Sequence, residues 1–209
     1  MITFAASGKS GGFLARNWGN RDTTELHHKS FDLHKKLAAE LGLESFRMIQ
    51  TLSVNGNTAG SNVASWLDRR VASETMDSEC AQVTPKELTD ALIRDATVKG
   101  AHVLISNVLG VRCEQGAVVG VETELHGLIE TEKVVVCLGP WSGVFCEDNF
   151  GMAFPMQGIK STSLVYEDVA ALRSEPFACF CEEDSNGCHL ELYSRVGEEL
   201  YVCGCGGSD

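Results

Sequence analysis

The chain has 209 residues, of which 44% are hydrophobic, which is enough to bury a core in one domain or in two interleaved ones. Its 29 acidic and 17 basic residues give a net charge of −12, and no dense run of Lys or Arg offsets it. This balance argues against nucleic acid and against an anionic membrane surface as partners.

The pattern of apolar residues and cysteines bears on the cellular compartment. No apolar run approaches the roughly 20 residues that a membrane helix needs, and the first four residues do not resemble a secretory signal. Nine cysteines could form a disulfide framework, but the number is odd and several, such as Cys137, lie in apolar runs. We therefore expect an intracellular, cytoplasmic protein with reduced thiols and no membrane partner.

The first predicted helix covers residues 23–41. Asp22 and Glu25 resemble a capping pair, and apolar residues then recur at helical spacing over 23–41. The segment 47–54 is rich in residues that favour extended chain and predicts a strand. The polar stretch 58–79 fits neither pattern.

A second helix has a clear start. Thr84 suits the cap, Pro85 suits the first helical position, and Glu87 stands three residues after the cap, so we expect a helix that runs to Gly100. Three predicted strands follow, at 101–105, 108–112 and 118–123.

The apolar run 134–138 predicts a buried parallel strand that stops at Gly139 and Pro140. Beyond Gly151 the pattern changes to short extended runs separated by turn residues, which indicates an antiparallel sheet. The predicted strands of this part are 161–166, 178–181, 189–193 and 200–203.

These elements predict a mixed α/β fold in which a Rossmann-like part is followed by a β-rich part. In such a fold the run 134–138 would share a sheet with Val103–Ile105.

The loop Ala6–Leu14 combines three glycines and two serines, whose small side chains let backbone N–H groups approach an anion. Taken alone, such a loop is more often a surface turn than a cofactor loop. Three cysteine groups, at 179–181, 188–189 and 203–205, could form a zinc module, but one residue between two cysteines is shorter than the usual zinc spacing, so we expect no metal.

Several other side chains have two interpretations. His27, His28 and His34 fall on one predicted helix, where we expect them to be solvated or packed rather than ligands. Arg195 could bind a substrate carboxylate through its forked guanidinium, with Tyr166 and Tyr193 nearby, but the sequence favours a surface arginine.

The chain resembles the D-amino-acid-oxidase-like (DAO-type) family of FAD-dependent oxidoreductases. The segments that carry the resemblance are 6–14 with the helix after it, 81–85, 100–103 with Val108, and 134–142. The resemblance implies a partial FAD-binding domain over 1–50 and 81–150 and a substrate-type sheet domain over 51–80 and 151–209.

The resemblance also implies which residues meet the cofactor. The residues implied are Ser7, Lys9, Gly11, Gly12, Phe13, Val108 and Gly139. Lys9 would add positive charge, Val108 would meet the adenine through its backbone, and Gly139 would lie against the cofactor. No catalytic acid or base is implied.

The family also has parts that this sequence lacks: a first strand, a G-x-G-x-x-G turn, a helix and an acidic ribose partner before the loop, and a glycine-rich closing segment. We therefore expect a chain truncated at both ends that binds FAD weakly or not at all. A lost charged hydrogen bond costs on the order of 1.5–3 kcal/mol. A lost helix end costs roughly 0.3–2 kcal/mol more, so affinity falls by about one to four orders of magnitude.

Two functions follow from the resemblance. The first is oxidation of an amine or amino-acid C–N bond by hydride transfer to FAD, with a small amine or amino acid as substrate. The second is a non-catalytic fragment that holds no FAD and acts at most as an interaction module.

Overall fold

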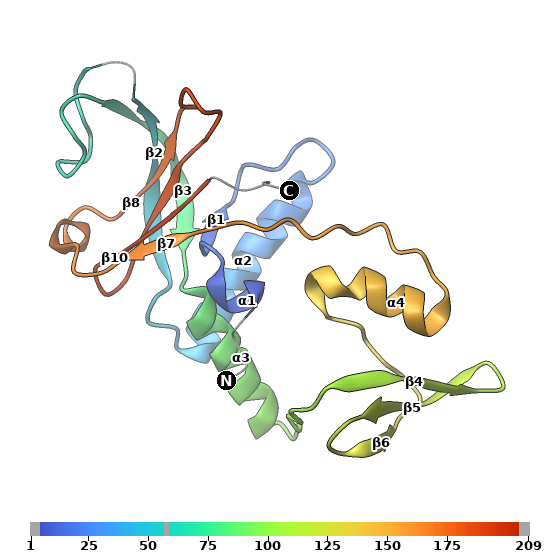
Figure 1. Cartoon of the computed structure of the whole chain (residues 1–209). Helices are drawn as coiled ribbons and strands as arrows, with labels where there is room; N and C mark the ends of the chain where they lie inside the picture. Colours follow the sequence, from blue (N-terminus) through green and yellow to red (C-terminus); the bar gives the residue numbers. More distant parts are fainter. Residues whose placement is uncertain (1–4, 57–58, 205–209) are drawn as a thin grey trace. The chain divides into compact units, whose positions relative to one another are not determined.

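The computed structural model describes residues 5–56 and 59–204. They form two compact units (Figure 1): unit 1 comprises the described residues up to Lys99 and from Lys160 onward, and unit 2 comprises residues 100–159. No helix in the described ranges is long and apolar enough to cross a membrane.

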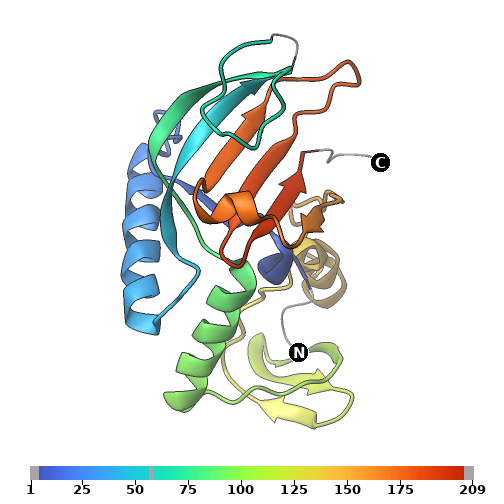
Figure 2. The ribbon, with the colours of Figure 1, turned by 90° about the vertical axis from the view of Figure 1, so that its left-hand side faces the viewer.

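Unit 1 is built on a seven-stranded sheet in the order β1-β3-β2-β8-β9-β10-β7, whose strands lie side by side in Figure 2. The strands are β1 (Phe13–Ala15), β2 (Arg47–Asn55), β3 (Ala72–Gln82), β7 (Leu164–Tyr166), β8 (Phe177–Cys181), β9 (Glu191–Arg195) and β10 (Glu199–Cys203). Only β2 and β8 pair in parallel; the other neighbours in this sheet are antiparallel. The helices are α1 (Ala6–Lys9), α2 (Thr24–Leu41), α3 (Pro85–Val98) and the short 3-10 helix η2 (Ala170–Arg173).

The sheet of unit 1 buries a different apolar cluster on each side, because alternate residues of a strand point to opposite faces. One cluster contains Ile49, Ala178, Tyr193 and Tyr201, with Phe13 packed against it. The other contains Leu52, Val54, Ala64 and Cys179, with partly buried residues that include Trp66, Leu67 and Val71 packed against it. The stretch around 59–71, for which the sequence predicted no element, therefore covers one face of the sheet.

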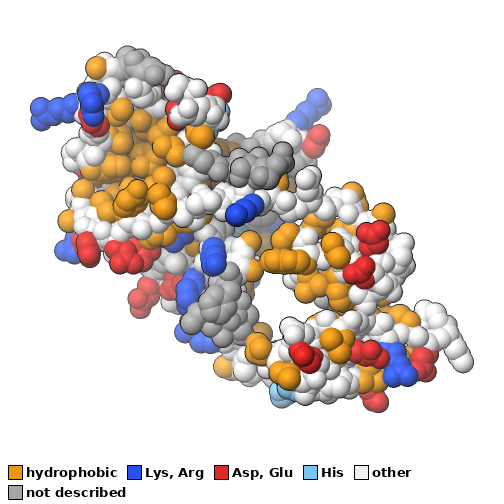
Figure 3. Space-filling model, viewed as in Figure 1, with side chains coloured by type: hydrophobic (Ala, Val, Ile, Leu, Met, Phe, Trp, Pro, Cys, Tyr) orange, Lys and Arg blue, Asp and Glu red, His pale blue; other side chains and the backbone are white. Residues whose placement is uncertain are grey.

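Unit 2 contains a three-stranded antiparallel sheet in the order β4-β5-β6 and one helix. Its elements are β4 (Val108–Glu114), β5 (Ala117–Thr123), β6 (Gly127–Glu130), the 3-10 helix η1 (Gly139–Trp141) and α4 (Ser142–Phe150). Many of its apolar side chains are exposed, including Val144 on α4, and Figure 3 shows hydrophobic side chains on the surface of this helix.

The mixed α/β class is confirmed, and so are both long helices and the strands over 47–54, 108–112, 118–123, 178–181 and 200–203. The strand expected at 161–166 is shorter and begins at Leu164. The strand expected at 189–193 is instead β9, which begins and ends two residues later. The expected domain boundaries stay a prediction.

Two predicted strands are wrong. Residues 101–105 and 134–138 pair with no strand in the part of the chain that the structure describes, so they do not share a sheet. Their apolar side chains are largely exposed, with Ile105 at 66% and Val135 at 84%. An apolar run predicts burial, but a strand also needs a neighbour that supplies backbone hydrogen bonds, and composition does not show whether one is present.

The predicted helix caps also differ from the structure. No side-chain cap bond is made at Thr23 or Thr84. At the first helix, the side-chain oxygen of Asn20 accepts hydrogen bonds from the backbone N–H groups of Asp22 and Thr23. Local capping patterns therefore located both helix starts but assigned the wrong hydrogen bonds.

At the second helix, the Glu87 carboxylate accepts hydrogen bonds from Glu44 N and from the backbone N and Oγ of Ser45, and so ties α3 to the turn before β2. Ser45 Oγ in turn accepts from Thr84 N at 2.8 Å. Burial alone would raise the pKa of Glu87, but the hydrogen bonds from Ser45 and Glu44 outweigh it and lower the pKa below its ordinary value.

The loop between α1 and β1 approaches its neighbours closely. Gly12 has a φ of +80°, and a Cβ there would lie 1.9 Å from Val83 O and 2.9 Å from Pro85 Cδ. A Cβ on Gly11 would lie 2.5 Å from Cε2 of Tyr193. Both glycines are therefore required by packing, whether or not a cofactor binds beside them.

Replacing Glu87 with Gln should lower the free energy of unfolding by about 1–2 kcal/mol at pH 7, because the bonds from Ser45 and Glu44 lose their charged acceptor. Since the folded pKa is lowered, the contribution is full above the unfolded value of about 4.3. It is lost as the pH falls through the folded pKa. Urea unfolding across this range tests it, with the exposed first-turn Glu25→Gln as control. If the free energies of unfolding of Glu87→Gln and wild type differed by the same amount at every pH, the account would be contradicted.

Replacing Gly12 with Ala should destabilise unit 1 more than replacing Gly42 with Ala. Both positions have positive φ, but a Cβ at Gly42 meets nothing within 4 Å. The backbone term of about 1–2 kcal/mol is common to both, and overpacking adds about 1–3 kcal/mol at Gly12 alone. Chemical denaturation measures both variants; equal losses would show that the contact with Val83 can relax.

Candidate functional site

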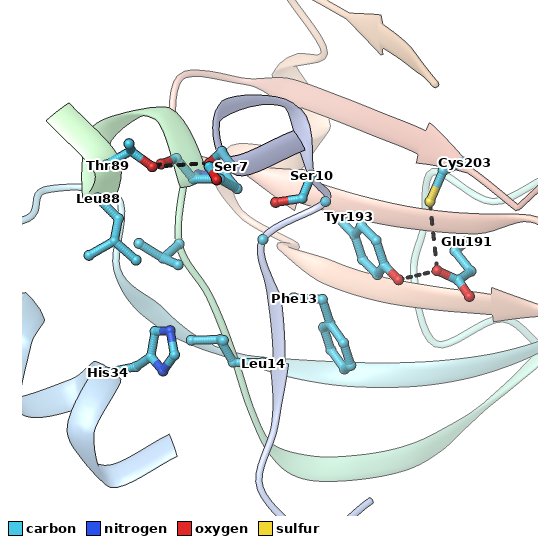
Figure 4. A pocket seen from close by; sticks show the side chains of 14 residues that line it. Ser7, Ser10, Phe13, Leu14, His34, Leu88, Thr89, Glu191, Tyr193 and Cys203 are labelled. Atoms are coloured by element: carbon cyan, nitrogen blue, oxygen red, sulfur yellow. Dashed lines mark hydrogen bonds between the residues drawn. The ribbon is translucent and has the colours of Figure 1, made fainter. Parts of the chain in front are cut away.

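A pocket of about 520 Å³ lies in unit 1 where the first loop meets the sheet (Figure 4). Its lining comes from α1 and the loop after it, from β1, α2, the residue after β3, the start of α3, β9 and β10. The residues that line it are Ser7, Ser10, Gly11, Gly12, Phe13, Leu14, His34, Val83, Pro85, Leu88, Thr89, Glu191, Tyr193 and Cys203. Its volume is typical of sites for small molecules.

Backbone carbonyls attach the loop to the rest of unit 1. Thr89 Oγ1 donates to Ser7 O at 3.1 Å, and Tyr201 Oη donates to Lys9 O at 3.1 Å. Arg195 Nη2 donates to Ser10 O at 2.7 Å. Carbonyls of α1 and of the residue after it are thus held from α3 on one side and from the sheet on the other.

Arg195 is the cation at the centre of this attachment, and the expectation of a surface arginine is wrong. Its residue is only 7% exposed, and its guanidinium carbon lies 4.4 Å from the centre of the Tyr201 ring. Burial lowers the pKa of Arg195, although the nearby Glu199 charge raises it. Nothing in the sequence around Arg195 distinguished a buried loop anchor from a surface charge.

Aromatic rings form one wall of the pocket. Phe13 stacks on Tyr193 with ring centres 5.3 Å apart and planes 7° apart. The Phe13 ring also contacts Trp18 and Phe180, each at 5.2 Å. Trp18 is held in turn by a 2.8 Å hydrogen bond from Nε1 to Asp77 Oδ2. The wall is therefore rigid and apolar.

Three polar groups of β9 and β10 meet at the pocket. Tyr193 Oη donates to Glu191 Oε2, and Cys203 Sγ lies 3.6 Å from the same oxygen (Figure 4). Burial and the neighbouring Glu191 raise the pKa of Tyr193, and the same causes raise that of Cys203 to about 11. Both groups therefore keep their protons at neutral pH and act as donors.

The sequence did not single out Glu191. The signal was available, because residues two apart on a strand share a face, so Glu191 had to lie beside Tyr193. The position of Cys203 opposite Glu191 depends on the register of β9 and β10, which the sequence did not determine.

The predicted cofactor residues fall into two groups. Ser7, Gly11, Gly12 and Phe13 all line the pocket, whereas the exposed Lys9 ends α1 beside it. Val108 begins β4 and Gly139 begins η1, so both belong to unit 2. Cofactor contacts at these seven positions stay a prediction.

The remaining singled-out side chains also have definite positions. His34 lines the pocket, and its Nδ1 lies 2.8 Å from Ser30 O. Tyr166 is 52% exposed on β7, away from the pocket lining. Cys179 is buried, and Cys205 lies outside the described residues. Within residues 5–56 and 59–204, no group of three or more His, Cys, Asp or Glu could hold a metal.

Solved structures with the same fold are amino-acid enzymes. Glycine oxidase from Bacillus cereus superposes with a TM-score of 0.76 at 18% identity, covering 97% of this chain and 63% of the oxidase. Glycine oxidase from Geobacillus kaustophilus gives 0.77 at 18% identity, covering 97% of this chain and 61% of that one. At this identity the likeness shows the fold.

Sequence relatives and a family model agree with the fold. The Schizosaccharomyces pombe protein C1F5.03c, provisionally named an oxidoreductase, is 25% identical over 236 residues, which cover 97% of this chain and 60% of that protein. The chain thus spans about 60% of the length of these relatives. The model of the DAO family, described as FAD dependent oxidoreductase, matches residues 1–208. The chain therefore belongs to the DAO family of FAD-dependent oxidoreductases.

Proposed function

We propose that this chain is part of an FAD-dependent oxidoreductase that oxidises the C–N bond of a small amine or amino acid. The observation that carries the proposal is the pocket between the first loop and the wall formed by β9 and β10, in a chain that the DAO family model covers almost completely. The names of the glycine oxidases of similar fold are consistent with this substrate class.

The loop residues fit a flavin cofactor in chemistry and in shape. Gly11 and Gly12 bring the backbone to the pocket without side chains, and Phe13 offers an apolar ring. The ammonium of Lys9 is exposed at the end of α1, where it could oppose a diphosphate charge. We propose that these residues, with Ser7, hold part of the cofactor.

Bound flavin would supply the redox chemistry by accepting a hydride from the carbon that carries the nitrogen. This chain would position the substrate, because its pocket has one aromatic wall and one polar wall. Phe13, Leu14 and Leu88 would exclude water from the apolar side. Tyr193 and Cys203 keep their protons at neutral pH and direct them to Glu191, so they would hold that carboxylate in place rather than remove protons from a ligand.

The purified chain should bind FAD weakly, and the binding should depend on the loop. Ser10 lines the pocket and is exposed, so Ser10→Glu places a negative charge where we expect the cofactor. We expect this variant to weaken FAD binding about tenfold, which corresponds to 1.4 kcal/mol. Lys9→Gln should weaken FAD binding less than Ser10→Glu does. Lys29→Gln, which changes an exposed lysine on α2, should not affect FAD binding.

Quenching of flavin fluorescence measures these dissociation constants. Absence of binding at millimolar FAD would contradict the proposal for this chain and support the non-catalytic alternative. Equal affinities for wild type and Ser10→Glu would show that FAD binds elsewhere.

A further inference from the structure

The ligand pocket of unit 1 carries a negative charge and no positive one. Glu191 is the only carboxylate among its lining residues, and no lysine or arginine lines it within the described part of the chain. His34 also lines the pocket, and its Nδ1 lies 2.8 Å from Ser30 O. A ligand that enters this pocket therefore meets a carboxylate without a counter-ion.

Glu191 is held in a fixed orientation by two donors on the same oxygen. Tyr193 and Cys203 both meet Oε2, and Figure 4 shows the other carboxylate oxygen pointing away from them. Within residues 5–56 and 59–204, Oε1 has no hydrogen-bond partner. Because both donors are held by burial in the strands, the carboxylate is oriented before any ligand arrives.

The nearest arginine on the same strand is already engaged. Arg195 donates to Ser10 O and stacks on Tyr201, and its Nη1 lies 3.9 Å from Glu199 Oε2. To bind a carboxylate in the pocket it would have to leave these contacts, and the loop would lose its anchor. Within the described residues Arg195 therefore forms no ion pair with Glu191, and it is not free to bind a ligand carboxylate.

We propose that this pocket binds its substrate through a cationic ammonium group and selects against carboxylates, with Glu191 as the specificity-determining residue. An amine without a carboxylate would place its charge at Glu191 and its apolar part against Phe13 and Leu14. A ligand carboxylate placed at Glu191 would meet like charge, because Arg195 is already engaged with Ser10 O and the Tyr201 ring. The inference rests on the proposed function only in treating the ligand as a substrate.

The test compares three ligands of matched ring size: benzylamine, benzoate and phenylalanine. Dissociation constants are measured by ligand-observed NMR on the full chain, with and without FAD. We expect benzylamine to bind about tenfold or more tightly than benzoate, since a charge-assisted hydrogen bond of this kind changes affinity by at least this factor. Phenylalanine should lie between the two.

Three variants locate the preference. Glu191→Gln should weaken benzylamine about tenfold and reduce its advantage over benzoate. Tyr193→Phe keeps the carboxylate and should keep the preference, which separates charge from loss of a neighbour. Glu182→Gln makes the same chemical change at an exposed position at the end of β8 and should change nothing. Circular dichroism confirms that each variant is folded.

Three results would overturn the proposal: benzoate or phenylalanine binding as tightly as benzylamine, unchanged benzylamine affinity in Glu191→Gln, or no binding of any of the three ligands. The separate FAD titration keeps the two proposals distinguishable. Selective amine binding without FAD binding would refute the proposed redox function and leave the ligand class standing. FAD binding together with a preference for carboxylates would refute the proposed ligand class and leave the proposed redox function standing.

Discussion

The buried guanidinium of Arg195 is the interaction on which the pocket depends. It donates to the carbonyl of Ser10 and lies over the ring of Tyr201, so it connects the loop, β9 and β10 at one point. A charge in this position is costly to bury unless its partners are fixed. The close approach of Gly12 to Val83 fixes the other side of the loop. Together these contacts give the pocket its walls before a ligand binds.

This anchoring also determines the charge of the pocket. Because Arg195 is used to hold the loop, the polar wall facing the ligand consists of Glu191 with two neutral donors. Strand β9 thus carries a structural cation, Arg195, and a ligand-facing anion, Glu191. The two are four residues apart, so both lie on one face of the strand. The structural use of one residue therefore constrains what its neighbour can recognise.

Local patterns predicted most elements of unit 1, and the resemblance of several segments identified the family. Periodicity and breakers located α2, α3 and β2, because those signals act within a few residues. The segment from Ala6 to Leu14 was also identified as a candidate cofactor loop. Its first four residues form α1 instead, and six residues between Ser7 and Leu14 line the pocket. What local patterns could not predict was pairing: the run 134–138 has the composition of a buried strand but no neighbouring strand in the described residues.

The polar wall escaped prediction for the same reason. Tyr193 was considered but Glu191 was not, although their spacing along β9 puts both side chains on one face. Only their meeting with Cys203 depends on strand register. The sequence favoured a surface arginine over a substrate-binding one at Arg195, and the structure instead buries it against the loop. The geometry of the site depends on long-range contacts of this kind, and local patterns in a single sequence do not predict them.

The central claim is that the loop from Ser7 to Phe13 and the wall at Glu191 and Tyr193 form one ligand site. An FAD titration followed through backbone amide NMR shifts tests it most directly. The account predicts progressive shifts in residues 7–13 and in β9, with little change along the exposed face of α2. Shifts confined to other segments, or none at saturating FAD, would contradict it.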